Sequence, residues 1–231
     1  MIKGMIFDLD NTLYDYTSAN AVAEEAIIAY MAEHYGEDRE KIAAALAQGR
    51  KITKQLLPEG AAQHSRILYL QHALELLGIN AIGEAWQLEE RFWQSFLANI
   101  EPYPGVQDML EYLKTKHIKT AICTDLTAAI QHRKLLRLGL KPYMDILVTS
   151  EEVGREKPYA GMFNLVLEKF QLPVQDVAMA GDSWEKDILG AHSLGIKALW
   201  KKEGKNEKLQ TDIWQYESYT DEYFKSLLGN I

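Results

Sequence analysis

The spacing of hydrophobic residues changes along the chain and predicts two kinds of structure. Residues 3–9 form a short apolar run that ends in acidic residues, which is too short for a helix and suits a buried strand. Residues 18–100 instead carry apolar side chains at helical spacing, as in Ala23, Ile27 and Met31. This second region predicts about four helices and no strand.

Beyond residue 101, short apolar runs alternate with helical segments. The expected strands are residues 120–124, 145–149, 176–180 and 196–200, and the expected helices are residues 128–138, 161–170 and 185–194. Such alternation predicts a parallel sheet with helices on both faces. We therefore expect an α/β core domain with a Rossmann-like parallel sheet, formed by residues 1–16 and 101–231. An all-helical domain of residues 17–100 is inserted into this core.

Composition narrows the range of partners and compartments. The chain has 231 residues, which suits one core domain with a large insertion. Its 25 basic and 33 acidic residues give a net charge of −8, which argues against binding a nucleic-acid polymer or an anionic membrane. Cys123 is the only cysteine, so no internal disulfide can form. The sequence shows no signal peptide and no bilayer-spanning run, so we expect a cytoplasmic protein. We expect it to be a monomer or a homodimer.

Polar residues capable of chemistry follow four of the expected strands. Ligands of open parallel sheets bind beyond the carboxyl ends of the strands, so these residues are expected to lie together. They are Asp8, Asp10 and Thr12 after the first strand, Thr124 and Asp125 after the second, Lys157 after the third, and Asp182 and Asp187 after the fourth.

The residue types in this cluster indicate phosphoryl transfer. Neighbouring carboxylates repel one another, and a hard divalent cation such as Mg²⁺ relieves that repulsion. A lysine beside them offers a point charge that suits a phosphate group. An aspartate can also act as a nucleophile and form an aspartyl-phosphate. The residues alone therefore predict metal-assisted phosphoryl transfer.

The same residues occur as four ordered motifs, and the chain resembles the haloacid dehalogenase superfamily of phosphohydrolases along essentially its whole length. The helical insertion resembles the C1 cap of that superfamily, a domain that closes over the active site. The motifs are Asp8-Leu9-Asp10-Asn11-Thr12-Leu13, Thr124 after Ala121-Ile122-Cys123, Lys157-Pro158, and Gly181-Asp182-Ser183 followed by Asp187.

The resemblance implies a role for each motif residue. Asp8 would be the nucleophile, Asp10 the general acid and then the general base, and Thr12 would fix their loop. Thr124 and the backbone N–H of Asp125 would donate hydrogen bonds to the phosphoryl oxygens. Lys157 would offset the charge of Asp8 and of the phosphoryl group. Mg²⁺ would be held by Asp8, Asp182, Asp187 and the backbone carbonyl of Asp10.

One position departs from the family pattern. Many members have asparagine and glycine after the second-motif threonine, whereas this chain has Asp125-Leu126. A further carboxylate near a phosphate is unfavourable unless it is directed elsewhere. We therefore expect the Asp125 side chain to cap the helix that starts at Thr127.

The expected function is that of a Mg²⁺-dependent phosphatase that hydrolyses small phosphomonoesters through an aspartyl-phosphate. Asp10 favours chemistry at phosphorus, because the dehalogenases of the superfamily lack an aspartate at that position. The substrate would be a small phosphorylated metabolite of the nucleoside monophosphate or sugar phosphate type, and Tyr14 is a candidate for contacting it. Two alternatives stay open, namely a phosphomutase of the same fold and a noncatalytic binding protein.

Overall fold

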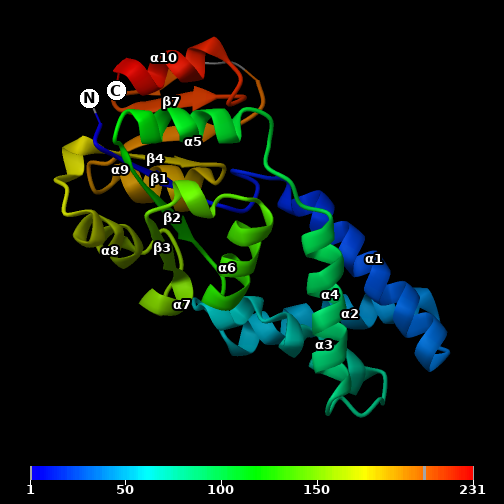
Figure 1. The fold of residues 1–231 in the computed structure, drawn as a ribbon. Helices are drawn as coiled ribbons and strands as arrows, with labels where there is room; N and C mark the ends of the chain where they lie inside the picture. The colour runs from blue at the N-terminus through cyan, green and yellow to red at the C-terminus, as the bar shows by residue number, and fades with distance from the viewer. Residues whose placement is uncertain (1, 205–206, 231) are drawn as a thin grey trace. The chain divides into compact units, whose positions relative to one another are not determined.

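The computed structural model describes residues 2–204 and 207–230, and it aligns the apolar runs predicted as strands in one sheet (Figure 1). Among the described residues, seven strands occur in the order β3-β2-β1-β4-β5-β7-β6. They are β1 (Gly4–Phe7), β2 (Lys119–Thr124), β3 (Ile146–Thr149), β4 (Val177–Gly181), β5 (Lys197–Lys201), β6 (Glu207–Gln210) and β7 (Ile213–Tyr216). Neighbouring strands pair in parallel except β6 and β7, which are antiparallel. The predicted α/β class is confirmed.

Helices cover both faces of this sheet. On one face, Ile6, Ala121 and Met179 pack against Phe163 and Phe170 of α8. On the other, α5 buries its apolar side, and Figure 1 shows α5 and α8 on opposite sides of the strands. The helices are α5 (Val106–Thr115), α6 (Ala128–Arg137), α7 (Ser150–Val153), α8 (Ala160–Phe170), α9 (Gly190–His192) and α10 (Glu222–Asn230), with short 3₁₀ turns η2 (Lys141–Tyr143) and η3 (Val174–Asp176).

The segment predicted as one helix over residues 185–194 has a different form. It consists of a π-helical turn η4 (Trp184–Leu189) followed by the short α9. The Ile188 amide donates to the carbonyl of Ser183 at 3.2 Å. These residues are five apart, which is the hydrogen-bond spacing of a π-helix. Asp187 lies within this turn, and its contacts at the end of β4 are described below.

A second compact unit comprises residues Tyr16–Ile100, and the remaining residues up to Asp15 and from Glu101 form the first. The region predicted as helical folds into α1 (Tyr16–Tyr35), α2 (Arg39–Leu56), α3 (Arg66–Leu76) and α4 (Glu84–Ala98), with a 3₁₀ turn η1 (Ala61–His64). Asp38 begins α2 by accepting the Glu40 and Lys41 amides at 2.9 and 3.1 Å. No helix in the described ranges is long and apolar enough to cross a membrane.

Within the first unit, the chain leaves and re-enters at neighbouring points. Tyr14 forms an antiparallel bridge with Pro102. The Tyr103 amide donates to the Leu13 carbonyl at 2.9 Å. The two segments that flank the insertion are therefore fastened to each other by backbone hydrogen bonds.

Helices α2 and α3 of the helical unit approach closely at Gly49. A Cβ atom at this position would lie 2.4 Å from the Tyr69 carbonyl oxygen and 3.0 Å from the Ala73 nitrogen. Both contacts are with backbone atoms, which cannot move aside as a flexible side chain can. Glycine is therefore required where the two helices cross.

We expect Gly49→Ala to destabilise the helical unit by about 1–3 kcal/mol, because the overpacking outweighs alanine's better helix propensity. Urea unfolding followed by circular dichroism measures the change. The matched control is Ala47→Ser at an exposed position of the same helix, where the change should stay within about 0.5 kcal/mol. A Gly49→Ala variant as stable as the native protein would show that the helix crossing tolerates a side chain.

Candidate active site

The predicted site residues of the first unit lie at the carboxyl edge of the sheet. Phe7 in β1 pairs with Ile122 in β2 and with Ala180 in β4, so the three strands end side by side. The Asp8 amide extends this pairing by donating to the Ala180 carbonyl at 2.9 Å. The loops that follow β1, β2 and β4 therefore start from a common edge.

Lys157 is the central cation of the cluster. Its Nζ lies 2.6 Å from Asp8 Oδ1 and 2.6 Å from Asp187 Oδ1, and all three side chains are buried. Burial opposes the charged form of Lys157, yet the carboxylates of Asp187 and Asp8 raise its pKa well above the usual value. The ammonium group therefore stays charged and joins the third motif to the first and the fourth.

The carboxylates nevertheless outnumber this cation. Burial raises the pKa of Asp8 to about 7, although Lys157 opposes the shift. Burial and the nearby Asp8 raise the pKa of Asp182 to about 6. Carboxylate oxygens of Asp8, Asp182 and Asp187 lie within 4.8 Å of one another. Three hard oxygen donors with excess negative charge fit a divalent cation of the magnesium type.

Thr12 links the loops of the first and fourth motifs. Its fully buried hydroxyl lies 2.9 Å from Asp8 Oδ2 and 3.1 Å from Asp182 Oδ1, and it accepts the Asp182 amide at 3.1 Å. A hydroxyl has one hydrogen, so it donates to one of the two carboxylates at a time. Thr12 thus fixes the spacing of two acidic side chains that are distant in the sequence.

The fourth motif depends on a close approach at Gly181. The Ser183 amide donates to Asp187 Oδ2 at 3.0 Å and holds this carboxylate against the end of β4. A Cβ atom on Gly181 would lie 2.4 Å from Asp187 Cβ. The absence of a side chain at Gly181 therefore makes room for Asp187.

The expectation for the Asp125 side chain is wrong. Thr127, not Asp125, occupies the cap position of α6 and makes no side-chain cap, and the Ala128 amide donates instead to Glu151 Oε2 at 2.7 Å. Asp125 Oδ1 accepts the Lys157 amide at 3.0 Å, and Oδ2 accepts Lys186 Nζ at 2.8 Å. The carboxylate thus has a cation and an amide as partners, and it fastens the second motif to the third.

Helix α6 contributes two polar residues that the motif analysis missed. Gln131 Nε2 donates to Thr124 Oγ1 at 2.8 Å and to the Asp125 carbonyl at 2.7 Å. One turn later, Lys134 Nζ lies 2.8 Å from both carboxylate oxygens of Asp10. Both side chains are fully buried beside Ile130 and Leu135. The available signal was a glutamine and a lysine three residues apart on the apolar side of a helix.

Tyr14 lies next to Asp10. Its ring is fully buried, and its hydroxyl donates to Asp10 Oδ1. The structure thus gives Tyr14 a contact with an acidic site residue. Its contact with substrate stays a prediction.

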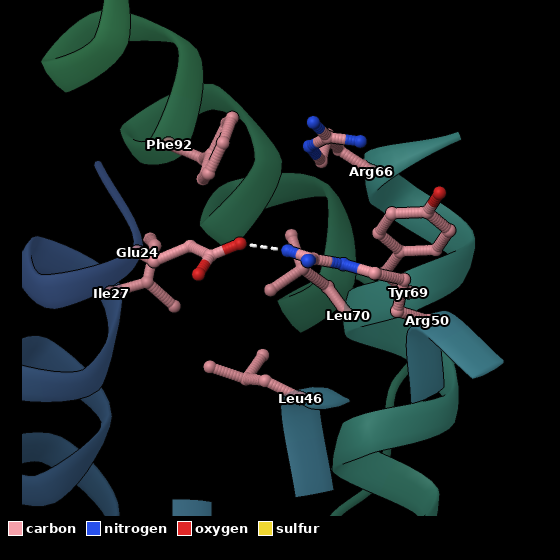
Figure 2. Close-up of a pocket in the computed structure, with 8 residues that line it drawn as sticks. All are labelled: Glu24, Ile27, Leu46, Arg50, Arg66, Tyr69, Leu70 and Phe92. Carbon is pink, nitrogen blue, oxygen red and sulfur yellow. Dashed lines mark hydrogen bonds and ion pairs between the residues drawn. The ribbon is translucent and has the colours of Figure 1, made fainter. Parts of the chain in front are cut away.

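The helical unit has a pocket of its own (Figure 2). Arg50 pairs with Glu24 across it, and the guanidinium of Arg66 lies 5.1 Å from the Tyr69 ring and 5.3 Å from the Phe92 ring. The cavity volume is about 30 Å³, which exceeds the roughly 10–15 Å³ that one water molecule needs. Both arginines have partners within the helical unit, since Arg50 pairs with Glu24 and Arg66 also donates to Asn20 Oδ1 at 3.2 Å.

Comparison with known proteins identifies the family. The model of haloacid dehalogenase-like hydrolases matches residues 2–195, and the chain belongs to this family. It is 38% identical to a ribulose-1,5-bisphosphate 5-phosphatase of Halopiger xanaduensis, over 86% of this chain and 84% of that one. It is 30% identical to the pyrimidine 5'-nucleotidase YjjG of Escherichia coli, over 85% and 84% of the two chains.

A solved structure shows the same fold over nearly the full length. The 2-haloacid dehalogenase from Pseudomonas syringae pv. Tomato DC3000 superimposes with a TM-score of 0.76 at 27% identity, covering 99% of each chain. The family predicted from the four motifs is confirmed.

Asp125 is expected to stabilise the site through two separable contacts. Asp125→Ala removes the charged acceptor of the Lys157 amide and should lower the free energy of unfolding by about 1.5–3 kcal/mol. Asp125→Asn keeps an oxygen for that amide and should lose less. Lys186→Met is the comparison, because it leaves the hydrogen bond of the Lys157 amide intact while it removes both ion pairs of Lys186, those with Asp125 and with Glu156. Equal losses in Asp125→Ala and Asp125→Asn would show that the amide contact contributes nothing.

Cys123 is expected to be unreactive in the folded protein. The thiol is fully buried, and burial raises its pKa to about 12, so almost no thiolate forms at neutral pH. A colorimetric disulfide reagent should therefore label one thiol in denaturant and almost none without it. Rapid labelling of the native protein would contradict this placement.

Proposed function

We propose that this chain is a Mg²⁺-dependent phosphatase that hydrolyses small phosphomonoesters through an aspartyl-phosphate on Asp8. One observation carries the proposal. The buried Asp8 carboxylate has one oxygen on the Lys157 ammonium and the other beside the Thr12 hydroxyl, next to two further carboxylates. This is an anionic nucleophile held in place by a cation, as phosphoryl transfer requires.

In the first step, Asp8 attacks phosphorus and the bond to the leaving oxygen breaks. Asp10 gives its proton to that oxygen, so an alcohol departs and an aspartyl-phosphate forms. Lys157 offsets the charge of Asp8 and the phosphoryl group. The Thr124 hydroxyl accepts Gln131 Nε2 and donates to the Asp125 carbonyl at 3.2 Å, so it would have to exchange that carbonyl for a phosphoryl oxygen when substrate binds.

In the second step, water attacks phosphorus while Asp10, now a carboxylate, accepts a proton from the water. The acyl-phosphate bond breaks, inorganic phosphate leaves and the Asp8 carboxylate is restored. The same group thus acts as acid and then as base. The presence of Asp10 favours this chemistry over dehalogenation.

The residues that would hold the metal are Asp8, Asp182 and Asp187, with the backbone carbonyl of Asp10. Their fit rests on the proximity of the three carboxylates. It also rests on the raised pKa values of Asp8 and Asp182, which are caused mainly by burial and in addition by the neighbouring carboxylates. When bound, Mg²⁺ supplies positive charge for the phosphoryl oxygens.

We infer that the substrate is a small phosphorylated metabolite of the sugar phosphate or nucleoside monophosphate type. The names of the two phosphatase relatives support both classes. The helical unit is proposed to act as the cap that selects among such substrates. A noncatalytic role has no comparable support, because all the motif residues are present. The motifs do not distinguish a phosphomutase, and hydrolysis is favoured over it by the relatives named as phosphatases.

Asp8→Asn is expected to abolish phosphate release from every substrate, because the amide cannot attack phosphorus. The assay measures inorganic phosphate from ribulose 1,5-bisphosphate, pyrimidine 5'-monophosphates and p-nitrophenyl phosphate, with Mg²⁺ and with a chelator. Asp176→Asn is the matched control. The Asp176 carboxylate pairs with Lys3 just before β4 begins, at the end of this strand opposite to the site. Unchanged turnover in Asp8→Asn, or in the chelator, would contradict the mechanism.

Isotopic water distinguishes attack at phosphorus from attack at carbon. In H₂¹⁸O, the label is expected in inorganic phosphate, and the peptide that contains Asp8 should stay unlabelled. Mass spectrometry of both products provides the measurement. Label in Asp8 would mean that water attacks its carboxyl carbon, as in hydrolysis of a carbon ester.

A further inference from the structure

Lys134 is a buried lysine outside the four motifs. Its side chain has no exposed surface, and its Nζ lies 2.8 Å from each carboxylate oxygen of Asp10, 124 residues away in the sequence. Lysine is almost never fully buried unless it is paired. The ion pair with Asp10 offsets the free energy lost when this ammonium is removed from water. Asp10 is the residue that the proposed mechanism uses for proton transfer.

Two side chains hold the Asp10 carboxylate in place, those of Lys134 and Tyr14. Tyr14 donates its hydroxyl to Asp10 Oδ1, and its ring centre lies 5.9 Å from Lys134 Nζ. Lys134 contacts both oxygens, so the plane of the carboxylate is fixed as well as its position. Helix α6 supports this arrangement, because Gln131 on the preceding turn is anchored to Thr124 and Asp125.

We propose that Lys134 is a positioning residue that sets the orientation of Asp10 for proton transfer to the leaving group. The proposal rests on the phosphatase function above. Lys134 acts through Asp10 and needs no contact with the substrate. Removing Lys134 leaves Asp10 with the Tyr14 hydroxyl, which meets one oxygen and permits the carboxylate to rotate.

The consequence depends on the leaving group. An alkyl phosphate releases a strongly basic oxygen and needs the proton from Asp10, whereas p-nitrophenolate leaves without one. General acid catalysis contributes about 10²–10⁴-fold, so partial misplacement of Asp10 should cost about 10–100-fold for an alkyl ester. The same change should cost less than about 3-fold for p-nitrophenyl phosphate.

The test measures kcat/KM of Lys134→Met for one sugar phosphate, ribulose 1,5-bisphosphate, and for p-nitrophenyl phosphate. We expect a loss confined to the sugar phosphate, a similar selective loss in Asp10→Asn, and no further loss when the two substitutions are combined. Lys134→Arg should recover part of the activity on the sugar phosphate, since it restores a cation beside Asp10. The matched control is Lys3→Met, whose exposed ion pair lies before β4.

Equal losses on both esters would overturn the proposal, because they would indicate general damage to the fold. Losses that multiply in the double variant would also overturn it, since Lys134 would then act without Asp10. If Lys134→Met does not fold, the comparison uses Lys134→Arg and the double variant, in which neither buried charge is left unpaired. Failure of the phosphatase function itself appears separately, as native turnover that Asp8→Asn does not abolish.

Discussion

The ion pairs of Lys157 are the interaction on which the rest of the site depends. A single buried ammonium contacts Asp8, in the loop after β1, and Asp187, in the π-helical turn after β4. Breaking a buried pair by removing one partner typically costs about 3–5 kcal/mol, because the remaining charge is left uncompensated. Here two carboxylates would lose their cation at once. The placement of Lys157 is in turn secured by Asp125, which accepts its amide, and Asp125 is balanced by Lys186. The site is therefore one connected network of charges.

This network is precise because it rests on the ends of parallel strands. Adjacent strands in register bring Asp8, Thr124 and Asp182 to one edge without long connecting loops. The finer spacing comes from small groups, namely the hydroxyl of Thr12 and the missing side chain of Gly181. Asp187 lies in the π-helical turn, and its carboxylate is held by the Ser183 amide. The fold supplies the edge, and these local features set the distances.

The sequence predicted the α/β core, the helical region and the four motifs, because these leave periodic patterns or short fixed spacings. It did not predict the partner of Asp125, because Lys186 lies 61 residues away and its approach depends on the tertiary fold. Lys134 escaped because a lysine in a helix resembles any solvated lysine until its burial is known. Strands β6 and β7 were missed as well, since β6 carries charged side chains and alternates only weakly. Sequence patterns identify the motif residues. The residues that orient the motif residues are identified only by tertiary contacts between distant parts of the chain.

The backbone bridge between Tyr14 and Pro102 has a consequence for how such a protein can change. The chain leaves the first unit and returns to it at two segments that are hydrogen-bonded to each other. The helical insertion between them is therefore attached to the first unit at one place. The intervening segment can lengthen, shorten or be exchanged without shifting the register of any strand. The sheet edge and the helical unit, which are the proposed places of chemistry and of substrate selection, can therefore vary independently. The junction at Tyr14 and Pro102 is the natural boundary for building chimaeras that keep the reaction and alter its range.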